Sequence, residues 1–361
     1  MAPLPASQQP NGRGARSNAT GRYESLTREA FDDGWTELDE APKKLRTVLH
    51  LERARKIIST NDSPDIGFDQ SINPYRGCEH GCIYCYARPA HAYVGFSPGL
   101  DFESQLFFKP EAARLLEKEL SRKSYQCKPI HIGGNTDPYQ PIERQLRITR
   151  QVIEVLDRFN HPFSIITKNA MITRDIDLLG PMAERNLVRT AVSVTTLDRK
   201  LARAMEPRAA TPERRLDAIR RLSEAGVRCA VSVAPIIPGL NDHEIEAIVQ
   251  RAAEAGASGA HFTALRLPLE IKDLFREWLQ SERPDRAARV MSLVRQMRGG
   301  KDYDARWNSR MRGEGPLAVL IQARFQAARK RFGLNRERSS LDVGQFRVPH
   351  GPTDQPDLFL G

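Results

Sequence analysis

The chain has 361 residues, of which 40% are hydrophobic, and carries a net charge of +10. This length suits one large domain or two ordinary ones with a sizeable core. The sequence contains no run of 18 apolar residues, so we expect no membrane-spanning helix. Five cysteines, three of them clustered, argue against a disulfide scaffold. We therefore expect a cytoplasmic globular protein without a membrane segment.

The N-terminal part of the chain lacks the apolar core of a secretory signal and is polar and basic. We expect a disordered arm over 1–22 and an extension over 23–67 that contains a short helix around Lys44–Ile58. The remainder divides into a core over 68–290, a basic helical extension over 291–338 and a flexible tail over 339–361.

Strands and helices are predicted to alternate through the core. The expected strands are Gln70–Tyr75, Pro129–Gly134, Phe163–Thr167, Val188–Thr195, Arg228–Ala234 and Ala260–Leu265. The expected helices are Pro110–Ser121, Ile148–Phe159, Ile176–Arg185, Pro212–Ala225 and Asp242–Ala255. This alternation predicts an α/β fold of parallel βαβ units, either a barrel or a doubly wound sheet, with the site at the C-terminal ends of the strands.

Three cysteines follow the first expected strand, at Cys78, Cys82 and Cys85, with the spacing C-x3-C-x2-C. Three thiolates on one loop can hold three irons of a [4Fe–4S] cluster and leave the fourth iron open to a ligand. A zinc site with His80 as fourth ligand is the first alternative, but Cys78 and His80 are too close for the usual spacing. A redox pair, Cys82–Cys85, is the second, but it leaves Cys78 unexplained.

The run SINPYRGCEHGCIYCYAR, with Tyr84 just before the last cysteine, resembles the signature of the radical S-adenosylmethionine (SAM) superfamily. The resemblance covers roughly 68–270 and implies a partial (β/α)6 barrel of the TIM type. It also implies that Cys78, Cys82 and Cys85 bind the cluster, that SAM chelates the fourth iron, and that an external electron donor reduces the cluster. SAM cleavage would then release a 5′-deoxyadenosyl radical.

Further residues at the strand ends extend this resemblance. Gly133 and Gly134 let a ligand approach the backbone closely, and they resemble the family's glycine motif for the SAM amino group. Lys168 and Arg266 end two other strands, and the Arg266 guanidinium could hold a carboxylate or phosphate. The resemblance assigns SAM contacts to Gly133, Gly134, Asn135, Asp137, Ser193, Thr195, Asn241 and Tyr84.

Within this superfamily the phrases NPYRGC and GGNTDPYQPIER, and the run MEPRAATPERRL, resemble the spore photoproduct lyase-like group of DNA repair enzymes. The resemblance implies a lyase-type enzyme acting on nucleic acid. In that lyase a cysteine returns hydrogen to the product, whereas Cys127 and Cys229 are expected at the opposite end of the barrel. Modification of a protein or small molecule remains an alternative, as does a non-catalytic nucleic-acid-binding protein stabilised by zinc or a cluster.

Two C-terminal segments suggest partners. The segment 295–338 holds twelve Lys and Arg against four acidic residues, and such a local basic surface favours nucleic acid. The residues Gln355–Phe359 resemble the peptide by which bacterial repair enzymes dock on the DNA sliding clamp. Both partners are therefore predicted for the C-terminal part of the chain.

Overall fold

The computed structural model describes residues 12–24, 45–335 and 340–349. The predicted clamp peptide Gln355–Phe359 and the first half of the predicted arm lie outside these ranges. No helix in the described part of the chain is long and apolar enough to cross a membrane.

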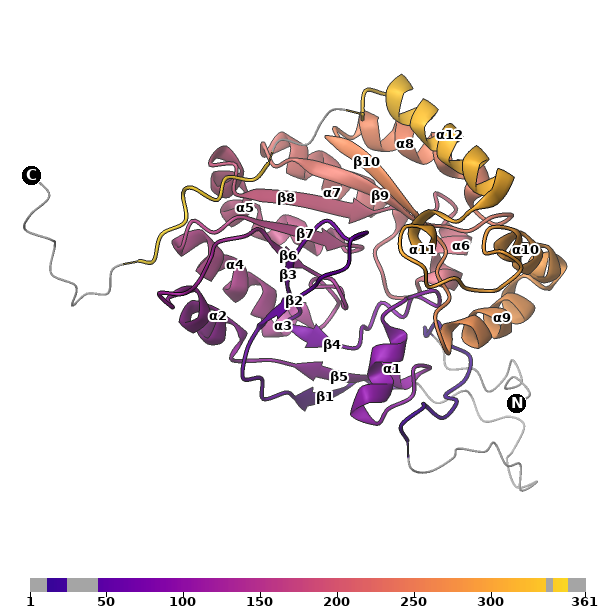
Figure 1. Cartoon of the computed structure of the whole chain (residues 1–361), viewed down its shortest axis with the longest axis horizontal. Coiled ribbons are helices and arrows are strands. Elements are labelled where there is room, and N and C mark those ends of the chain that lie inside the picture. Colours follow the sequence, from indigo (N-terminus) through magenta and orange to yellow (C-terminus); the bar gives the residue numbers. More distant parts are fainter. Residues whose placement is uncertain (1–11, 25–44, 336–339, 350–361) are drawn as a thin grey trace, which may run out of the picture.

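A seven-stranded sheet forms the centre of the molecule (Figure 1). Its strands are β2 (Ile58–Thr60), β3 (Gln70–Ile72), β6 (Ile130–Ile132), β7 (Phe163–Thr167), β8 (Val188–Ser193), β9 (Cys229–Ile236) and β10 (Gly259–Ala264). All neighbours from β3 to β10 pair in parallel, in the order of the chain, and only β2 is antiparallel. The strand order does not reverse at a switch point, so the sheet is a partial barrel and not a doubly wound sheet. The six predicted strands are confirmed.

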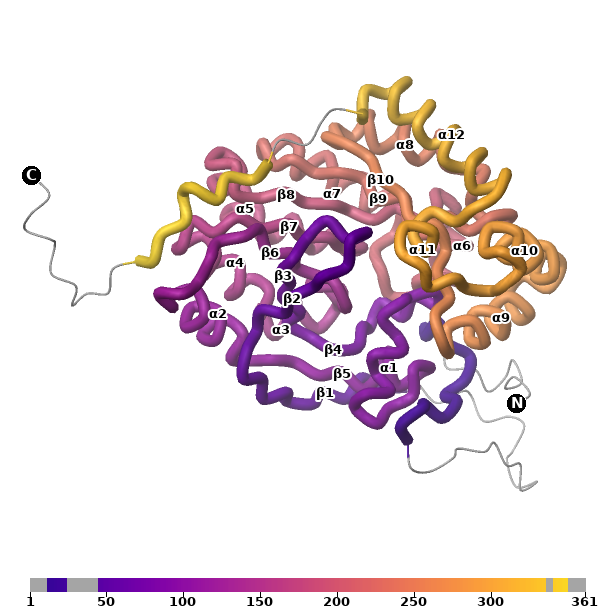
Figure 2. Tube along the Cα trace, viewed as in Figure 1, coloured from indigo at the N-terminus to yellow at the C-terminus, as the bar shows by residue number. Residues whose placement is uncertain are grey.

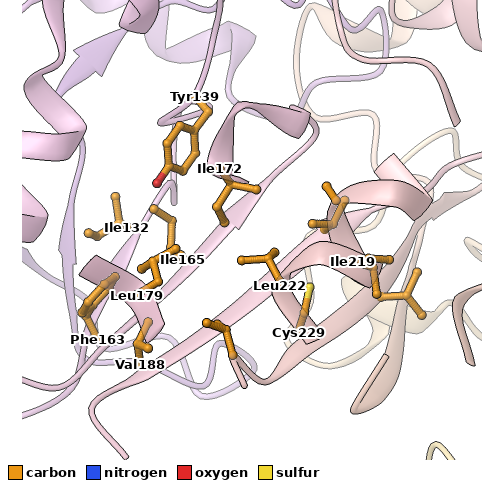
Figure 3. Packing of buried hydrophobic residues seen from close by; sticks show 14 of the residues in the cluster. Ile132, Tyr139, Phe163, Ile165, Ile172, Leu179, Val188, Ile219, Leu222 and Cys229 are labelled. Carbon is orange, nitrogen blue, oxygen red and sulfur yellow. The ribbon is translucent and has the colours of Figure 1, made fainter. Parts of the chain in front are cut away.

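Helices connect the parallel strands, and the longer ones pack their apolar sides against the sheet. They are α2 (Ala112–Leu120), α3 (Glu143–Leu146), α4 (Ile148–Arg158), α5 (Ile176–Glu184), α6 (Arg199–Met205), α7 (Pro212–Glu224) and α8 (Ile245–Glu254). Short 3-10 helices, η2 (Arg88–Val94), η3 (Ala170–Asp175) and η4 (Asp242–Glu244), occur in the loops. Figure 3 shows the core between these layers, where Phe163 and Ile165 of β7 lie near Leu179 of α5.

A second, three-stranded sheet lies beside the first and consists of β1 (Val48–Leu51), β5 (Gln105–Phe108) and β4 (Tyr75–Arg76). Helix α1 (Asp101–Ser104) precedes β5. The helix predicted for Lys44–Ile58 is wrong, because 48–51 is a strand that pairs in parallel with β5. Pairing with a neighbouring strand outweighs a weak helical pattern, and Val48 and Leu51 remain exposed on this edge.

Residues 12–24 lie against the body of the protein, so the prediction of a disordered arm is wrong for 12–22. Arg13 and Ala15 are buried. The Arg13 guanidinium donates to the Leu45 carbonyl and to the Thr47 hydroxyl. These contacts order a polar segment whose sequence has no helical or strand periodicity.

The C-terminal part is helical, as predicted, and consists of α9 (Ile271–Glu282), α10 (Pro284–Gln296), α11 (Ser309–Arg312) and α12 (Gly315–Arg331). Helix α12 runs beside α8 (Figure 1), with Ile321 and Phe325 buried. Helix α10 continues unbroken across the domain boundary predicted at 290. In 340–349, Phe346 stacks on Phe159, which shows that part of the predicted tail packs on the barrel.

The loop between β2 and β3 joins the two edges of the seven-stranded sheet. Figure 2 shows this indigo loop extending toward α11, which follows the opposite edge strand β10. The Asp65 carboxylate accepts hydrogen bonds from the Arg310 guanidinium, 2.7 Å from Nε, and from the Asn308 backbone N–H. We call this contact the edge clasp.

Candidate active site

The cysteine loop begins after β4, at the C-terminal end of the large sheet. The Cys78 N–H donates to the Phe102 carbonyl at 2.9 Å, and the chain then turns twice, with Gly81 N–H bonded to Cys78 O and Cys85 N–H bonded to Cys82 O. Cys78 and Cys82 are buried and Cys85 is half-buried. The three thiols therefore lie on one compact loop at the end of the sheet where the strand order predicts an active site.

The buried side chain of Arg88 binds the backbone of the cysteine loop. Its side chain is fully buried, and its guanidinium donates to the carbonyls of Cys82 at 2.9 Å and Gly81 at 3.1 Å. It also donates to the carbonyls of Pro98 and Gly99 and to the Glu103 carboxylate. One side chain thus fixes the backbone of the second cysteine relative to the segment that precedes α1.

Glu103 connects Arg88 to the N-terminal segment. Its buried carboxylate accepts the backbone N–H of Gly14 at 2.9 Å and of Ala15 at 2.8 Å. Gly14 lies so close to the cysteine loop that an added Cβ would overlap the Gly81 carbonyl oxygen. The N-terminal segment is therefore part of the support of the cysteine loop.

The loop after β6 supports the cysteine loop from the other side. The Thr136 hydroxyl donates to the Gly77 carbonyl at 2.7 Å, and the Gln140 side chain accepts the Glu79 N–H at 2.9 Å. Both contacts flank Cys78. The sequence phrase NTDPYQ therefore positions the first cysteine, a role that the turn chemistry of the phrase does not indicate.

The Asp137 carboxylate faces protein donors. It accepts the Thr167 hydroxyl at 2.6 Å and the Lys168 N–H at 2.8 Å, and its Oδ2 is 3.2 Å from Nδ1 of His80. Burial raises the pKa of Asp137, but the charge and hydrogen bond of His80 and the two donors outweigh burial and lower the pKa to about 2. Asp137 is thus a buried anion that braces the ends of β6 and β7.

His80 does not complete a zinc site with the cysteines. Its two ring nitrogens lie beside the Asp137 carboxylate and the Asn169 amide. Within the described ranges, no three His, Cys, Asp or Glu side chains converge as a mononuclear metal site requires. His80 therefore contacts Asp137 and Asn169 and not a cysteine thiol.

A buried polar group links Tyr84 to the end of β8. The Thr195 hydroxyl donates to the Glu206 carboxylate at 2.6 Å and lies 3.1 Å from the Tyr84 hydroxyl. Tyr84 and Arg215 also donate to this carboxylate. The structure thus brings the predicted residues Tyr84 and Thr195 together around an anion.

Lys168 and Ser193 meet beside this group. The Lys168 ammonium donates to the Ser193 hydroxyl at 2.6 Å and lies 5.6 Å from the centre of the Tyr84 ring. Burial lowers the pKa of Lys168, while the nearby thiols and Asp137 oppose the shift. This lysine is a cation whose charge acts on the thiols of both Cys82 and Cys85.

The two predicted backbone contacts, at Gly133 and Gly134, lie at the end of β6. Gly133 has φ +99°, and a Cβ there would be 2.9 Å from the Ile166 carbonyl oxygen, so the turn requires glycine. Asn135 is exposed, and its N–H donates to the Asn73 side chain. Gly133 and Gly134 are half-buried and Asn135 is exposed, so this turn reaches the surface beside the cysteine loop.

Asn241 lies behind the site. Its amide donates to the carbonyls of Thr195 and Pro235 and accepts the Ile237 N–H at 2.6 Å. These partners use the polar atoms of the side chain, so Asn241 joins the ends of β8 and β9. It supports the site through backbone positions.

Burial raises the pKa of all three cysteine thiols. Asp137 adds to this shift at Cys78 and Glu206 adds to it at Cys82, whereas Arg88 opposes it at Cys85. Thiolates in such surroundings need a bound cation, and the iron of a cluster supplies that charge. The donor set therefore fits a [4Fe–4S] cluster.

Half of the chain matches a known family. The family model described as the radical SAM superfamily covers residues 72–252. The chain belongs to the radical SAM superfamily. The cysteine loop and most of the partial barrel lie within the matched region of this radical SAM protein.

Relatives of this radical SAM protein include an uncharacterised protein of Mycobacterium tuberculosis (strain ATCC 25618 / H37Rv), which is 36% identical over 230 residues, covering 63% of this chain and 68% of that protein. A second relative is the radical SAM Nα-GlyT isomerase of Pseudomonas phage M6, 25% identical over 198 residues, covering 52% of this chain and 38% of that protein.

Among solved structures, spore photoproduct lyase complexed with dinucleoside spore photoproduct has a TM-score of 0.56 at 16% identity, covering 79% of each chain. A double mutant of that lyase, with bound AdoMet and the dinucleoside spore photoproduct, gives the same values. At this identity the likeness shows that the fold is shared.

Sequence reasoning missed most residues that support the cysteine loop of this radical SAM protein. Arg88 and Glu206 stand in or beside the quoted motifs, but motif letters do not show which charges are buried. Glu103 and Gly14 lie outside every motif. Cys127 precedes β6 and Cys229 begins β9, which places both at the end of the sheet opposite the cysteine loop, as predicted.

Proposed function

We propose that this protein is a radical SAM enzyme that binds a [4Fe–4S] cluster through Cys78, Cys82 and Cys85 and leaves the fourth iron to SAM. The observation that carries the proposal is the fixed loop of three thiols at the C-terminal end of the partial barrel. When bound, the cluster supplies the electron that cleaves SAM and releases the 5′-deoxyadenosyl radical. The electron comes from an external donor.

The predicted SAM residues divide into two groups in this proposal. Gly133, Gly134 and Asn135 form the partly exposed turn after β6 that SAM would approach. The remaining residues hold those ends in place from inside the protein and keep water from the thiols. This second group consists of Tyr84, Asp137, Ser193, Thr195 and Asn241, whose polar atoms bond to protein partners.

A nucleic acid is the substrate class that we propose for the radical. Support comes from the fold shared with a lyase solved with a dinucleoside photoproduct and from the excess of basic residues in 295–338. A protein or small-molecule substrate is the alternative, and a non-catalytic nucleic-acid-binding protein is the second. Because Cys127 and Cys229 lie at the far end of the barrel, hydrogen return must use a group other than these two thiols.

Iron content and SAM cleavage test the enzymatic proposal. Protein purified without oxygen should be brown, hold about four irons per chain and release 5′-deoxyadenosine when reductant and SAM are added. Cys82→Ala should abolish the product, because one cluster iron loses its thiolate. A colourless zinc protein, or undiminished 5′-deoxyadenosine from Cys82→Ala, would refute the assignment. Cys127→Ala is the matched control and should retain both properties.

We also propose that Gln355–Phe359 binds the DNA sliding clamp through Leu358 and Phe359. Leu358 and Phe359 carry large apolar side chains, and transfer of such side chains from water into a partner's pocket is favourable. Deletion of 355–361 should abolish capture of the full chain by an immobilised bacterial clamp while leaving the iron content unchanged. Equal capture of the truncated and full chains would show that the clamp does not read this peptide.

A further inference from the structure

Arg266 follows β10 and points its charge toward the cysteine loop. Its Cζ lies 5.0 Å from the centre of the Tyr86 ring, and Tyr86 directly follows Cys85. Nε of Arg266 is buried without a hydrogen-bond partner, and in the described ranges no carboxylate lies within ion-pair distance of this guanidinium. A partly buried cation of this kind is stabilised by an anion that reaches it from solvent.

Tyr86 connects Arg266 to the turn after β6. Its hydroxyl donates to the Gly134 carbonyl, which is one of the proposed SAM contacts. Nevertheless, 46% of the Tyr86 surface is exposed. Tyr86 and Arg266 therefore lie side by side at the surface, next to the turn after β6. We call these two residues the rim.

Trp307 extends this rim along the C-terminal segment. It is 49% exposed, and Cζ of Arg310 lies 5.0 Å from the centre of its ring. The sulfur of Met311, the residue after Arg310, is 3.5 Å from Nη1 of Arg266. A continuous path of contacts thus leads from Tyr86 through Arg266 to Trp307.

The edge clasp keeps Trp307 in this place. Arg310 donates to the Asp65 carboxylate while it covers one face of the indole ring. Because a guanidinium already lies on one face, the exposed part of the ring is a rigid surface for another planar group. Arg312, the next cation along, has no carboxylate partner in the described part of the chain.

We propose that Tyr86, Arg266 and Trp307 bind a single-stranded segment of nucleic acid at the mouth of the cysteine loop. Arg266 binds a backbone phosphate, and Trp307 and Tyr86 stack on unpaired bases. Stacked aromatic rings with an interposed cation match the alternation of bases and phosphates along a strand. The inference rests on the proposed function and specifies how its substrate class is held.

Binding of a short oligothymidylate to the full-length protein, purified without oxygen, tests the inference in the absence of SAM and reductant. In a Trp35→Phe background the exposed emission comes from Trp307, since Trp278 is fully buried and Trp35 is replaced. The oligonucleotide should quench this emission. Trp307→Ala should weaken binding roughly tenfold to a hundredfold, while Trp307→Phe keeps most of the affinity. Arg266→Gln should weaken it roughly tenfold.

Matched variants separate this surface from other cationic sites. Arg220→Gln, which changes an exposed side chain of α7, should leave oligonucleotide affinity unchanged. Unchanged affinity in both Arg266→Gln and Trp307→Ala, without quenching, would overturn the inference. So would loss of affinity only in Arg329→Gln and Arg331→Gln, which would place the contact on α12.

Titration of SAM into the cluster-loaded protein distinguishes the two anions that Arg266 could bind. If Arg266→Gln weakens SAM binding and leaves oligonucleotide affinity intact, the partner is the SAM carboxylate and the inference is wrong. A protein that cleaves SAM but does not bind the oligonucleotide refutes this inference alone. A protein that binds the oligonucleotide but never cleaves SAM refutes the proposed function alone.

Discussion

Buried polar side chains around the cysteine loop bond mainly to its backbone. Arg88 bonds to the carbonyls of Gly81 and Cys82, and Gln140 bonds to the N–H of Glu79. Removing one partner of a buried charged contact such as that of Arg88 leaves the other unpaired, at a cost of about 3–5 kcal/mol. The position of the three thiols therefore depends on buried residues other than the cysteines themselves.

Gly14→Ala tests this dependence with the smallest change. The new Cβ would overlap the Gly81 carbonyl oxygen, so the N-terminal segment must move away and Glu103 loses its backbone donors. We expect the free energy of unfolding to fall by about 1–3 kcal/mol and bound iron to decrease. Urea denaturation and iron analysis of protein purified without oxygen measure both.

Gly67→Ala is the matched control, because nothing lies within 4 Å of a Cβ at that position and its φ is ordinary. It should change neither stability nor iron content. If Gly14→Ala behaves like this control, the N-terminal segment does not support the cysteine loop.

At the scale of elements, segments with a regular apolar periodicity were predicted correctly. The short strand β1 was not. The strand Phe163–Thr167 and the helices between parallel strands were predicted because their apolar positions repeat over whole elements. Strand β1 was mistaken for a helix, because its four residues form a strand only through pairing with β5. The packing of residues 12–24 was not predicted for the same reason, because it depends on contacts with residues far away in the sequence.

The whole molecule is a partial barrel whose two edge regions are joined by the edge clasp. The side chains of Asp65 and Arg310 are 3% and 17% exposed, so the contact is largely shielded from water. The loop that carries Asp65 also carries Phe68, which stacks on His131 of β6 with ring centres 4.3 Å apart. The edge clasp thus connects the C-terminal extension to the β2–β3 loop, which itself packs on β6.

Asp65→Asn should destabilise the protein in a pH-dependent manner. The Arg310 hydrogen bonds lower the pKa of Asp65 to about 2, against the opposing effect of burial. A depressed carboxyl pKa contributes stability that is complete above the unfolded value of about 4 and is lost as the pH falls toward the folded value. The loss at neutral pH, measured by urea denaturation, should be about 1.5–3 kcal/mol and should shrink as the pH falls below about 4.

Asp69→Asn provides the comparison for this prediction. Asp69 forms an ion pair with Lys128 in which both side chains are more than half exposed, and such pairs contribute about 0–1 kcal/mol. An equal effect of the two substitutions, or an effect of Asp65→Asn that does not vary with pH, would show that the clasp does not hold the edges together.

Fewer positive charges are free to bind an anionic partner than the sequence of the molecule suggests. In the basic segment, Arg295 pairs with Asp302, Arg306 with Asp304 and Arg324 with Glu246. Arg298 is buried and donates to backbone carbonyls. The count of basic residues therefore overstates the positive surface of the extension, and Arg266, which lies outside it, emerges as a cation without an anionic partner among the described residues.

The sequence alone determined that the three cysteines lie together, because their short spacing keeps them on one loop whatever surrounds them. It also determined the alternation of strands and helices, since periodicity is a local property. The tertiary structure confirmed the partial barrel that the resemblance implied, and it alone showed that Glu103 and Gly14 support the cysteine loop. It also decided that Asp137 and Asn241 face inward. Those roles depend on burial and on partners far apart in the chain, which local sequence patterns do not encode.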